Sequence, residues 1–226
     1  LRPGQQDTAL LVAGLLEEQG QHDLAIAVYA SISADNPSFY VAEIGRAEAN
    51  YAAGRKEAAL EILQGLARAK PDLLVAQVAL ADAYRRDEHF AEARKSYDLA
   101  IGLLTEPAAE NWPLYFSRGI CAERLGDFDA TVADLEEALR LNPEQPQVLN
   151  YLGYSYVDRG ENLDEALGIR HRMAGLVNRA EFAAILLHLP ERDGVHAHFL
   201  IERFLEGDDL ALIGLAALRR RGRVRI

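Results

Sequence analysis

Cysteine, methionine and tryptophan are almost absent from this sequence, each occurring once in 226 residues. The single cysteine, Cys121, excludes an intramolecular disulfide and a zinc site built from cysteines. Long apolar runs are missing too: the longest spans residues 210–218, well short of the roughly 18 residues that cross a bilayer. Only eight prolines occur, and no glycine- or serine-rich stretch, which argues against a disordered chain. What remains is a folded chain whose 50% apolar residues are ample for a buried core.

Basic residues are also in short supply. Lysine and arginine together number 24 against 35 aspartates and glutamates, which gives a formal net charge of −11. Affinity for RNA or DNA rests largely on basic side chains that displace counterions from phosphates, so this balance disfavours nucleic acid as a partner. The shortage is uneven: residues 1–167 carry 14 basic and 28 acidic residues, whereas residues 168–226 carry ten and seven. We therefore treat residues 168–226 as a separate segment.

The sequence repeats itself with a period of 34 residues, the separation of Pro37 and Pro71. Gly54 and Gly126 lie 72 residues apart, four more than two periods, which places an insertion near residues 106–111. Periods of this length are typical of helical repeat arrays. Other positions that follow the same period are Gly20 and Gly54; Ala25, Ala59 and Ala93; and Tyr29, Leu63 and Tyr97.

Apolar residues inside a repeat recur at three- and four-residue steps, which predicts amphipathic helices with these residues on their apolar faces. In the third repeat they are Val75, Val78, Ala79 and Ala83, followed by Phe90, Ala93, Tyr97 and Ala100. The glycine between two such helices supplies the positive φ of a tight helix end. Asp127 or Asp129, and Asn162 or Asp164 in the next repeat, are suited to cap the following helix. Each repeat is therefore predicted to form one helix pair.

Two stretches resemble the tetratricopeptide repeat family, in which Leu-Gly and Tyr are followed by Ala, an aromatic residue, Ala and Pro. They read YFSRGICAERLGDFDATVADLEEALRLNP (residues 115–143) and LNYLGYSYVDRG (residues 149–160). The resemblance covers residues 6–167 and implies an all-α fold, a right-handed superhelical solenoid of about five antiparallel helix pairs. The units are expected near residues 6–39, 40–73, 74–107, 112–145 and from 146–167 onward.

The repeat signature ends near Leu167. Residues 168–226 still contain helical spacing, so we expect an irregular helical C-terminal segment. Two interpretations stay open: a native cap that covers the last apolar face of the solenoid, or an aberrant tail. The basic run from Arg219 to Arg225 is interpreted as a frayed terminus rather than a site for RNA or anionic lipid.

Motifs that carry chemistry are missing from the sequence. It contains no P-loop, GxGxxG, GxSxG or HExxH string, so we expect no enzyme activity, no cofactor and no metal. His188, His196 and His198 are interpreted as a chance grouping, because cysteine and defined carboxylate partners for a metal are lacking. Cys121 is expected to be a small core residue, and Trp112 to pack inside a helix pair rather than stack on a ligand.

The resemblance also implies a partner-binding groove, lined on the concave side by the first helix of each pair. Tyr51, Arg85, Phe116 and Tyr154 are the expected anchors in it, because aromatic and arginine side chains are the usual hot spots of interfaces. Asn150 occupies a slot that carboxylate-clamping members of the family use, but earlier units have apolar residues there, which disfavours such a clamp. The predicted groove residues are Glu48, Tyr51, Asp82, Arg85, Arg86, Phe116, Ile120, Glu123, Asn150 and Tyr154.

The expected function is a non-catalytic scaffold that binds a peptide or partner helix in this groove and helps to assemble or localise a bacterial complex. The run QPQVLNYLGYSYVDRGENLDEAL (residues 145–167) is similar to repeat proteins with an export signal, which favours the periplasm or cell envelope over the cytoplasm. The chain begins at Leu1, so a trimmed chain and a removed signal are both open. Two alternatives remain: an RNA-binding helical repeat, which the acidic body opposes, and a regulatory domain of a larger enzyme.

Overall fold

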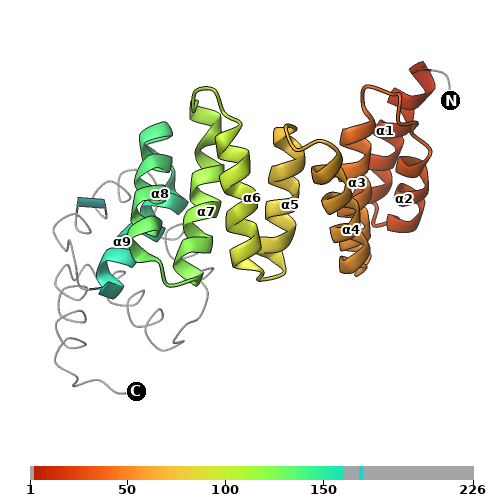
Figure 1. The fold of residues 1–226 in the computed structure, drawn as a ribbon. Helices are drawn as coiled ribbons and strands as arrows, with labels where there is room; N and C mark the ends of the chain where they lie inside the picture. The colour runs from red at the N-terminus through yellow and green to blue at the C-terminus, as the bar shows by residue number, and fades with distance from the viewer. Residues whose placement is uncertain (1–2, 160–167, 170–226) are drawn as a thin grey trace. The chain divides into compact units, whose positions relative to one another are not determined.

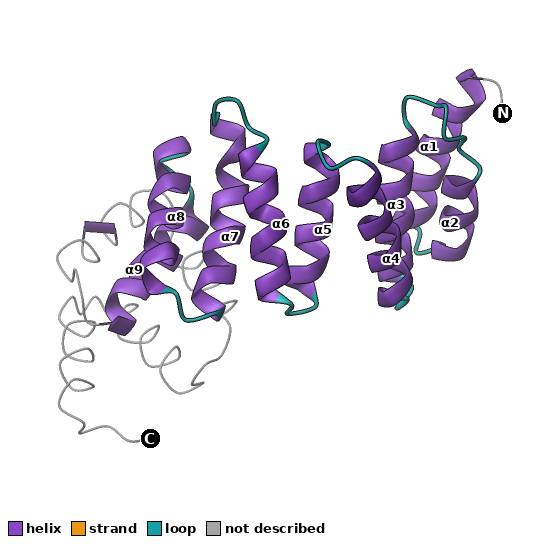
Figure 2. Cartoon of the chain, in the orientation of Figure 1, coloured by secondary structure: helices purple, strands orange, loops and turns teal. Residues whose placement is uncertain are grey.

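The computed structural model describes residues 3–159 and 168–169, and the side chains of residues 3–7 and 157–159 are left out of the description. Within these ranges the regular elements are all helices, joined by turns and loops, and there is no strand (Figures 1 and 2). The all-α prediction is therefore confirmed. The helices are α1 (Pro3–Glu18), α2 (His22–Ala30), α3 (Phe39–Ala52), α4 (Lys56–Ala69), α5 (Leu74–Arg86), α6 (Phe90–Gly102), the short 3-10 helix η1 (Ala109–Asn111), α7 (Trp112–Arg124), α8 (Phe128–Leu141) and α9 (Pro146–Arg159).

Helices that follow each other in the chain pack against each other, as a helical repeat solenoid requires. In one compact unit, residues 1–106, each of α1 to α5 packs on the next helix along the chain. In a second unit, residues 107–226, α7 packs on α8 and α8 on α9. The boundary falls in the segment between α6 and α7, where the sequence carries its insertion.

The turn inside each helix pair is built the same way four times. Gly20, Gly54 and Gly126 have φ of 69°, 79° and 79°, as the sequence predicts for these positions. After α3 the amide of Gly54 donates to the carbonyl of Tyr51 at 2.9 Å and the amide of Arg55 to that of Asn50 at 2.9 Å. These bonds satisfy carbonyls at the helix end that would otherwise lack partners.

The fourth of these turns carries a glutamate in place of glycine. Glu88 has φ 61° and lies one period after Gly54. Its amide donates to the carbonyl of Arg85 at 3.1 Å, and the amide of His89 donates to that of Tyr84 at 2.9 Å, so the bonding pattern is unchanged. The backbone of this turn is therefore set by the repeat, and Glu88 adopts the left-handed conformation despite its side chain.

The core of the described residues combines many buried alanines with a smaller number of large side chains. The periodic alanines Ala25, Ala59 and Ala93 are at most 1% exposed, and Tyr97 and Cys121 are fully buried. These burials confirm the core predicted from the period. A Cβ atom on Gly45 would lie 2.5 Å from the Cζ atom of Tyr29, which shows how closely α3 approaches α2.

One predicted core residue is wrong. Val75 was expected on the apolar face of its helix, but it is 49% exposed. The inward face of α5 is formed by Ala76, Leu80 and Ala83, which are 0%, 8% and 0% exposed. Because neighbouring residues on a helix point about 100° apart, Val75 turns away from the core although it fits the apolar spacing.

Asp127 caps α8: its carboxylate accepts the amide of Ala130 at 3.2 Å, as predicted. Several other predictions lie outside the described residues, namely the alternative caps Asn162 and Asp164, the histidines His188, His196 and His198, the run from Arg219 to Arg225, and the helical character of residues 170–226.

Candidate functional site

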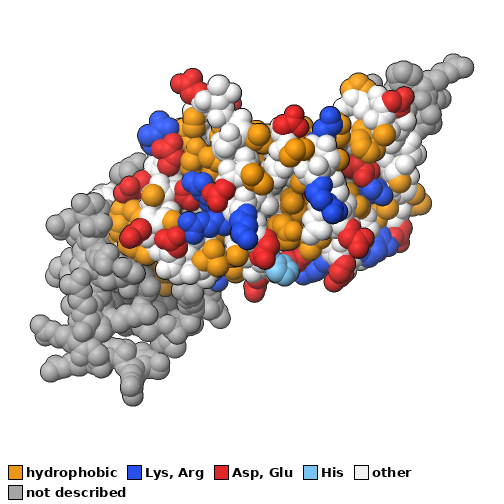
Figure 3. Space-filling model, viewed as in Figure 1, with side chains coloured by type: hydrophobic (Ala, Val, Ile, Leu, Met, Phe, Trp, Pro, Cys, Tyr) orange, Lys and Arg blue, Asp and Glu red, His pale blue; other side chains and the backbone are white. Residues whose placement is uncertain are grey.

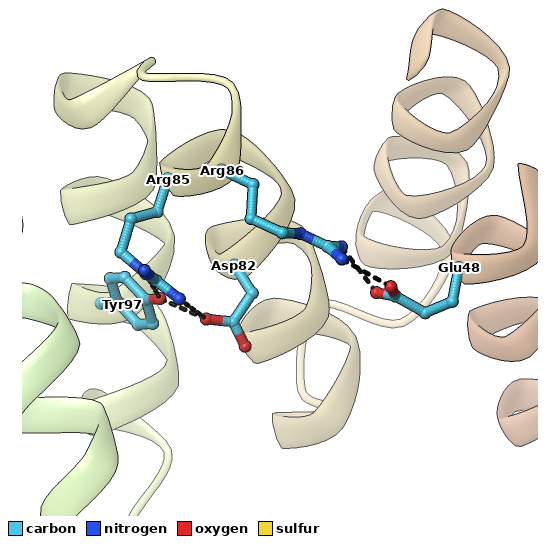
Figure 4. Close-up of polar contacts among 5 residues, drawn as sticks. All are labelled: Glu48, Asp82, Arg85, Arg86 and Tyr97. Atoms are coloured by element: carbon cyan, nitrogen blue, oxygen red, sulfur yellow. Dashed lines mark hydrogen bonds and ion pairs between the residues drawn. The ribbon is translucent and has the colours of Figure 1, made fainter. Parts of the chain in front are cut away.

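An ion pair joins the first helices of two successive repeats in residues 1–106. Arg86 on α5 donates to Glu48 on α3 through both terminal nitrogens, at 2.6 and 2.7 Å (Figure 4). The two side chains are 32% and 38% exposed, so the bond lies at the surface. A bidentate arginine–carboxylate pair fixes orientation as well as charge. The structure thus pairs two of the predicted groove residues, and each neutralises the charge of the other.

Tyr51 supports this pair from α3. Its ring lies under the guanidinium of Arg86, with the Cζ atom 4.3 Å from the ring centroid. The Tyr51 hydroxyl donates to Asp87 at 2.9 Å, and Lys56 approaches the same carboxylate at 2.9 Å. Partial burial of Asp87 works against ionisation, but these two hydrogen bonds outweigh it and hold the pKa of Asp87 below its usual value. The aromatic anchor predicted at Tyr51 is therefore engaged within the chain.

A second set of hydrogen bonds joins Asp82 and Arg85 of α5 to Tyr97 of α6 (Figure 4). The Tyr97 hydroxyl donates to Asp82 at 2.6 Å, and Arg85 donates to that hydroxyl at 3.1 Å and to Asp82 at 3.2 Å. Burial, and next the Asp82 carboxylate, raise the pKa of Tyr97. Tyr97 thus stays protonated and holds both charged side chains at the helix surface.

α3 and α5 also carry an apolar row, of which the sequence analysis missed the two exposed valines. Val41 on α3 is 54% exposed, and Val75 on α5, one period later, is 49% exposed. Ile44 and Val78 continue the row one turn further along each helix and are half-buried. The signal was available, because Val41 and Val75 repeat with the period of 34, but apolar spacing alone assigned Val75 to the core.

In residues 107–226, the structure brings predicted residues of α7 together with α9. The rings of Phe116 and Tyr151 meet edge to face at a centroid distance of 5.7 Å, and Trp112 lies 5.9 Å from Phe116. Trp112 therefore packs on a neighbouring ring in its own helix. Burial, reinforced by the nearby Glu123 carboxylate, raises the pKa of Tyr151 to about 12. Tyr151 was not among the predicted residues, although it lies one residue after Asn150.

The other predicted residues of this unit differ in their exposure. Tyr154 is 39% exposed and presents a ring to solvent, and Ile120 and Glu123 are half-buried. Asn150 is only 5% exposed, because the neighbouring Val148 and Leu149 draw this turn of α9 into the core. Asn150 therefore offers little surface to a partner, unlike the accessible groove residue that was expected.

The described residues contain no group of three or more histidine, cysteine, aspartate or glutamate side chains placed to hold a metal ion. No helix in that part of the chain is both long enough and apolar enough to cross a membrane. Acidic and basic side chains intermingle with apolar ones on the face in view (Figure 3). The surface is therefore suited to contacts with another protein rather than to a single-sign ligand.

Comparison with protein families decides the assignment. One tetratricopeptide repeat model matches residues 16–79 and another matches residues 116–169. This chain belongs to the tetratricopeptide repeat family. The repeats and the helical solenoid they form make it a protein-interaction scaffold, and proteins of this family are generally non-catalytic.

Two curated proteins are similar to this tetratricopeptide repeat chain. A TPR repeat-containing protein of Pseudomonas aeruginosa is 27% identical over 152 residues, which cover 67% of this chain and 25% of that protein. A protein of Schizosaccharomyces pombe described as DnaJ homolog subfamily C member 7 homolog is 24% identical over 109 residues, covering 48% and 22%. The chain thus matches only about a quarter of the length of these relatives.

Solved structures agree on the fold. A thermophilic TPR protein of Thermus thermophilus has a TM-score of 0.58 at 24% identity, covering 80% of this chain and 99% of that one. The protein MamA has a TM-score of 0.62 at 18% identity, covering 73% and 93%. At these identities the likeness establishes the solenoid fold and nothing further.

Proposed function

We propose that this chain is a non-catalytic scaffold that binds a peptide or a helix of a partner protein on the surface formed by its first helices. The observation that carries the proposal is the exposed row of Val41 and Val75, repeated from α3 to α5 at equivalent positions. We call these valines, which occupy equivalent positions on the first helices of successive repeats, the apolar strip; exposed apolar side chains of this kind are where partner segments dock.

The charges beside the strip decide what kind of partner fits. Glu48 is paired with Arg86, and Asp82 with Arg85 and Tyr97, so the chain itself neutralises them. A partner that competed for these groups would first have to break bidentate or tyrosine-supported bonds. We therefore expect apolar side chains of the partner to contribute most of the affinity, with little dependence on salt.

In residues 107–226 the exposed ring of Tyr154 offers an additional apolar contact. The polar groups near it are already engaged in the chain: Tyr151 donates to Glu123 at 3.5 Å, and Arg124 lies 3.3 Å from the same carboxylate. These polar groups are therefore satisfied within the chain, and the ring of Tyr154 is the feature that we expect a partner to contact.

The proposed setting is the assembly or localisation of a bacterial complex at the periplasm or cell envelope. The similarity to a TPR repeat-containing protein of Pseudomonas aeruginosa supports a bacterial setting. The likeness of residues 145–167 to exported repeat proteins supports the envelope over the cytoplasm.

The test compares the proteins that cross-link to the wild-type chain with those that cross-link to two variants, in which the same kind of apolar-to-glutamine change is made at different sites. Val41→Gln with Val75→Gln removes the apolar strip, whereas Leu99→Gln changes an equally exposed leucine (59%) on the second helix α6. We expect partners cross-linked to the wild-type chain to be lost from the valine variant and kept by the leucine variant. Identical capture by all three proteins would show that the first-helix surface is not the binding site.

A further inference from the structure

Helices α7 and α9 share a surface that is rich in aromatic rings. Trp112, Phe116 and Ile120 follow each other at four-residue steps on one side of α7, and all three are half-buried. Tyr151 of α9 meets Phe116 edge to face at a centroid distance of 5.7 Å, which joins the two helices. Tyr154, one turn further along α9, is 39% exposed. We call these five residues the aromatic face. An apolar segment laid on it would complete the burial of the rings.

The charge of the unit that carries the aromatic face is one-sided. Residues 107–159 include nine acidic and four basic residues. Three of the four basic residues are already engaged in ion pairs within the unit. These pairs are Arg118 with Asp134 at 2.6 Å, Arg124 with Glu123 at 3.3 Å and Arg140 with Glu137 at 2.7 Å. An excess of negative charge therefore remains, and it favours an occupant that combines apolar side chains with positive charge.

The chain itself contains a segment of that composition. Residues 210–226 read LALIGLAALRRRGRVRI, an apolar run followed by five arginines, with no acidic residue. Arginine side chains stack on aromatic rings and pair with carboxylates, so this segment matches both the rings and the charge of the unit. On sequence alone its basic run was interpreted as a frayed terminus. The aromatic face offers the segment a binding surface in the same chain.

The segment also has the reach that docking requires. The described residues end at Ile169, and 40 residues lie between Ile169 and Leu210. A chain of that length spans on the order of 35 Å as a flexible coil. The 13 residues of α7, by comparison, extend over about 20 Å. A tether of this kind gives an effective concentration on the order of mM, so weak contacts are sufficient for docking within one chain.

We propose that residues 210–226 dock on the aromatic face of the same chain. The apolar run covers the rings, and the arginines lie beside the acidic groups of the unit. The segment then occupies the surface around Tyr154, and a partner that contacts Tyr154 has to displace it. This regulatory consequence rests on the proposed function, whereas the docking itself does not.

Fluorescence of the full chain tests the docking, because Trp112 is its only tryptophan and belongs to the aromatic face. Replacing Arg219, Arg220 and Arg221 by glutamine should release the segment, shift the emission of Trp112 to longer wavelength and increase its quenching by acrylamide. Salt at about 1 M should act in the same direction. The matched control replaces three arginines outside the segment by glutamine and should leave the fluorescence as in the wild type. These arginines are Arg172, Arg179 and Arg192.

A second readout locates the segment directly. Cys121 is fully buried, so mild oxidation of a variant with Tyr154→Cys and Leu212→Cys should join the two introduced thiols within one chain. The control combines Leu212→Cys with Leu125→Cys, because Leu125 is 47% exposed but lies outside the aromatic face, at the end of α7. It should form much less disulfide.

Unchanged Trp112 fluorescence in the variant of Arg219 to Arg221, or equal disulfide formation by both cysteine pairs, overturns the proposal. Neither readout needs a partner protein. A failure here is therefore distinct from a failure of the capture experiment on the apolar strip, which tests the proposed function.

Discussion

The turn after α5 places a glutamate in a conformation that suits glycine. At φ 61°, Glu88 adopts the left-handed region that the equivalent glycines occupy at 69° and 79°. We expect Glu88→Gly to raise the free energy of unfolding by roughly 0.5–1 kcal/mol, because relief of the steric cost exceeds the added entropy of the unfolded chain. Urea denaturation measures the change. Gly54→Ala, the reverse exchange in the preceding repeat, should lower stability by roughly 1 kcal/mol, and a destabilised Glu88→Gly variant would contradict this account.

Gly45 is required for the approach of α3 to α2. A methyl group there would lie 2.5 Å from the ring of Tyr29, which is 5% exposed and held by a 2.6 Å hydrogen bond to Glu17. Moving the ring sacrifices that bond, so Gly45→Ala should destabilise the chain by roughly 1–2 kcal/mol in urea denaturation. Gly65 of α4 has open space around it, and Gly65→Ala should stabilise by up to about 1 kcal/mol. Equal effects at both sites would exclude the steric explanation.

At the scale of elements, the bond between Glu48 and Arg86 couples α3 to α5. Both side chains are about one-third exposed, so we expect a coupling energy of ~0.5–1 kcal/mol, at the upper end for surface pairs because the bond is bidentate. A double-mutant cycle with Glu48→Gln and Arg86→Gln measures it by chemical denaturation. The coupling should shrink in about 1 M salt. If the changes in unfolding free energy of the two single variants simply add at low salt, the pair orients the two helices but does not stabilise the fold.

The helix end at Asp87 should respond to acid. Its pKa is lower in the folded chain than in the unfolded one, because hydrogen bonds from Lys56 and Tyr51 outweigh partial burial. A carboxylate of this kind stabilises the fold above its unfolded pKa of about 3.9, and the stabilisation is lost as pH falls through the lower folded value. Asp87→Asn should therefore lose less stability than the wild type between about pH 5 and pH 2.5. An unchanged slope in Asp87→Asn would refute the assignment.

The sequence predicts a position well where a single physical requirement fixes its residue. It predicts less well where two requirements, such as apolar spacing and the phase of the helix, compete. Glycine at the helix turns and alanine in the core follow directly from the period, and both are confirmed at Gly54 and Ala59. Val75 was misjudged in exposure, because a one-residue change of phase rotates a side chain by about 100° around the helix. Asn150 keeps the phase of the repeat but lies in a turn of α9 that is buried together with Val148 and Leu149. The pairing of Glu48 with Arg86 joins residues 38 positions apart, and periodicity specifies which helices are neighbours but not which rotamers meet.

At the scale of the whole molecule, the period of 34 residues and the resemblance to the tetratricopeptide repeat family together predicted an all-α solenoid. The reason is physical: a single helix pair exposes an apolar face, so identical pairs in sequence must stack on one another. The same reasoning does not specify a partner, because the surface positions of a repeat are free to vary while the core is kept. The candidate site is thus identified from which side chains the structure exposes, as at Val41, and which charges it pairs, rather than from the repeat pattern.

The overall charge provides a test against the RNA-binding alternative. The net charge is −11, and Arg85 and Arg86 of α5 are already bonded to Asp82 and Glu48, so these two predicted groove arginines are engaged within the chain rather than offered to phosphates. We expect fluorescence anisotropy of a labelled single-stranded RNA to show no binding at low salt, because such binding requires the release of counterions by basic groups. Weak binding through the basic run would disappear when Arg219, Arg220 and Arg221 are replaced by glutamine. Binding that persists in this variant and falls steeply with salt would identify an RNA-binding surface within the repeats and overturn the scaffold assignment of the groove.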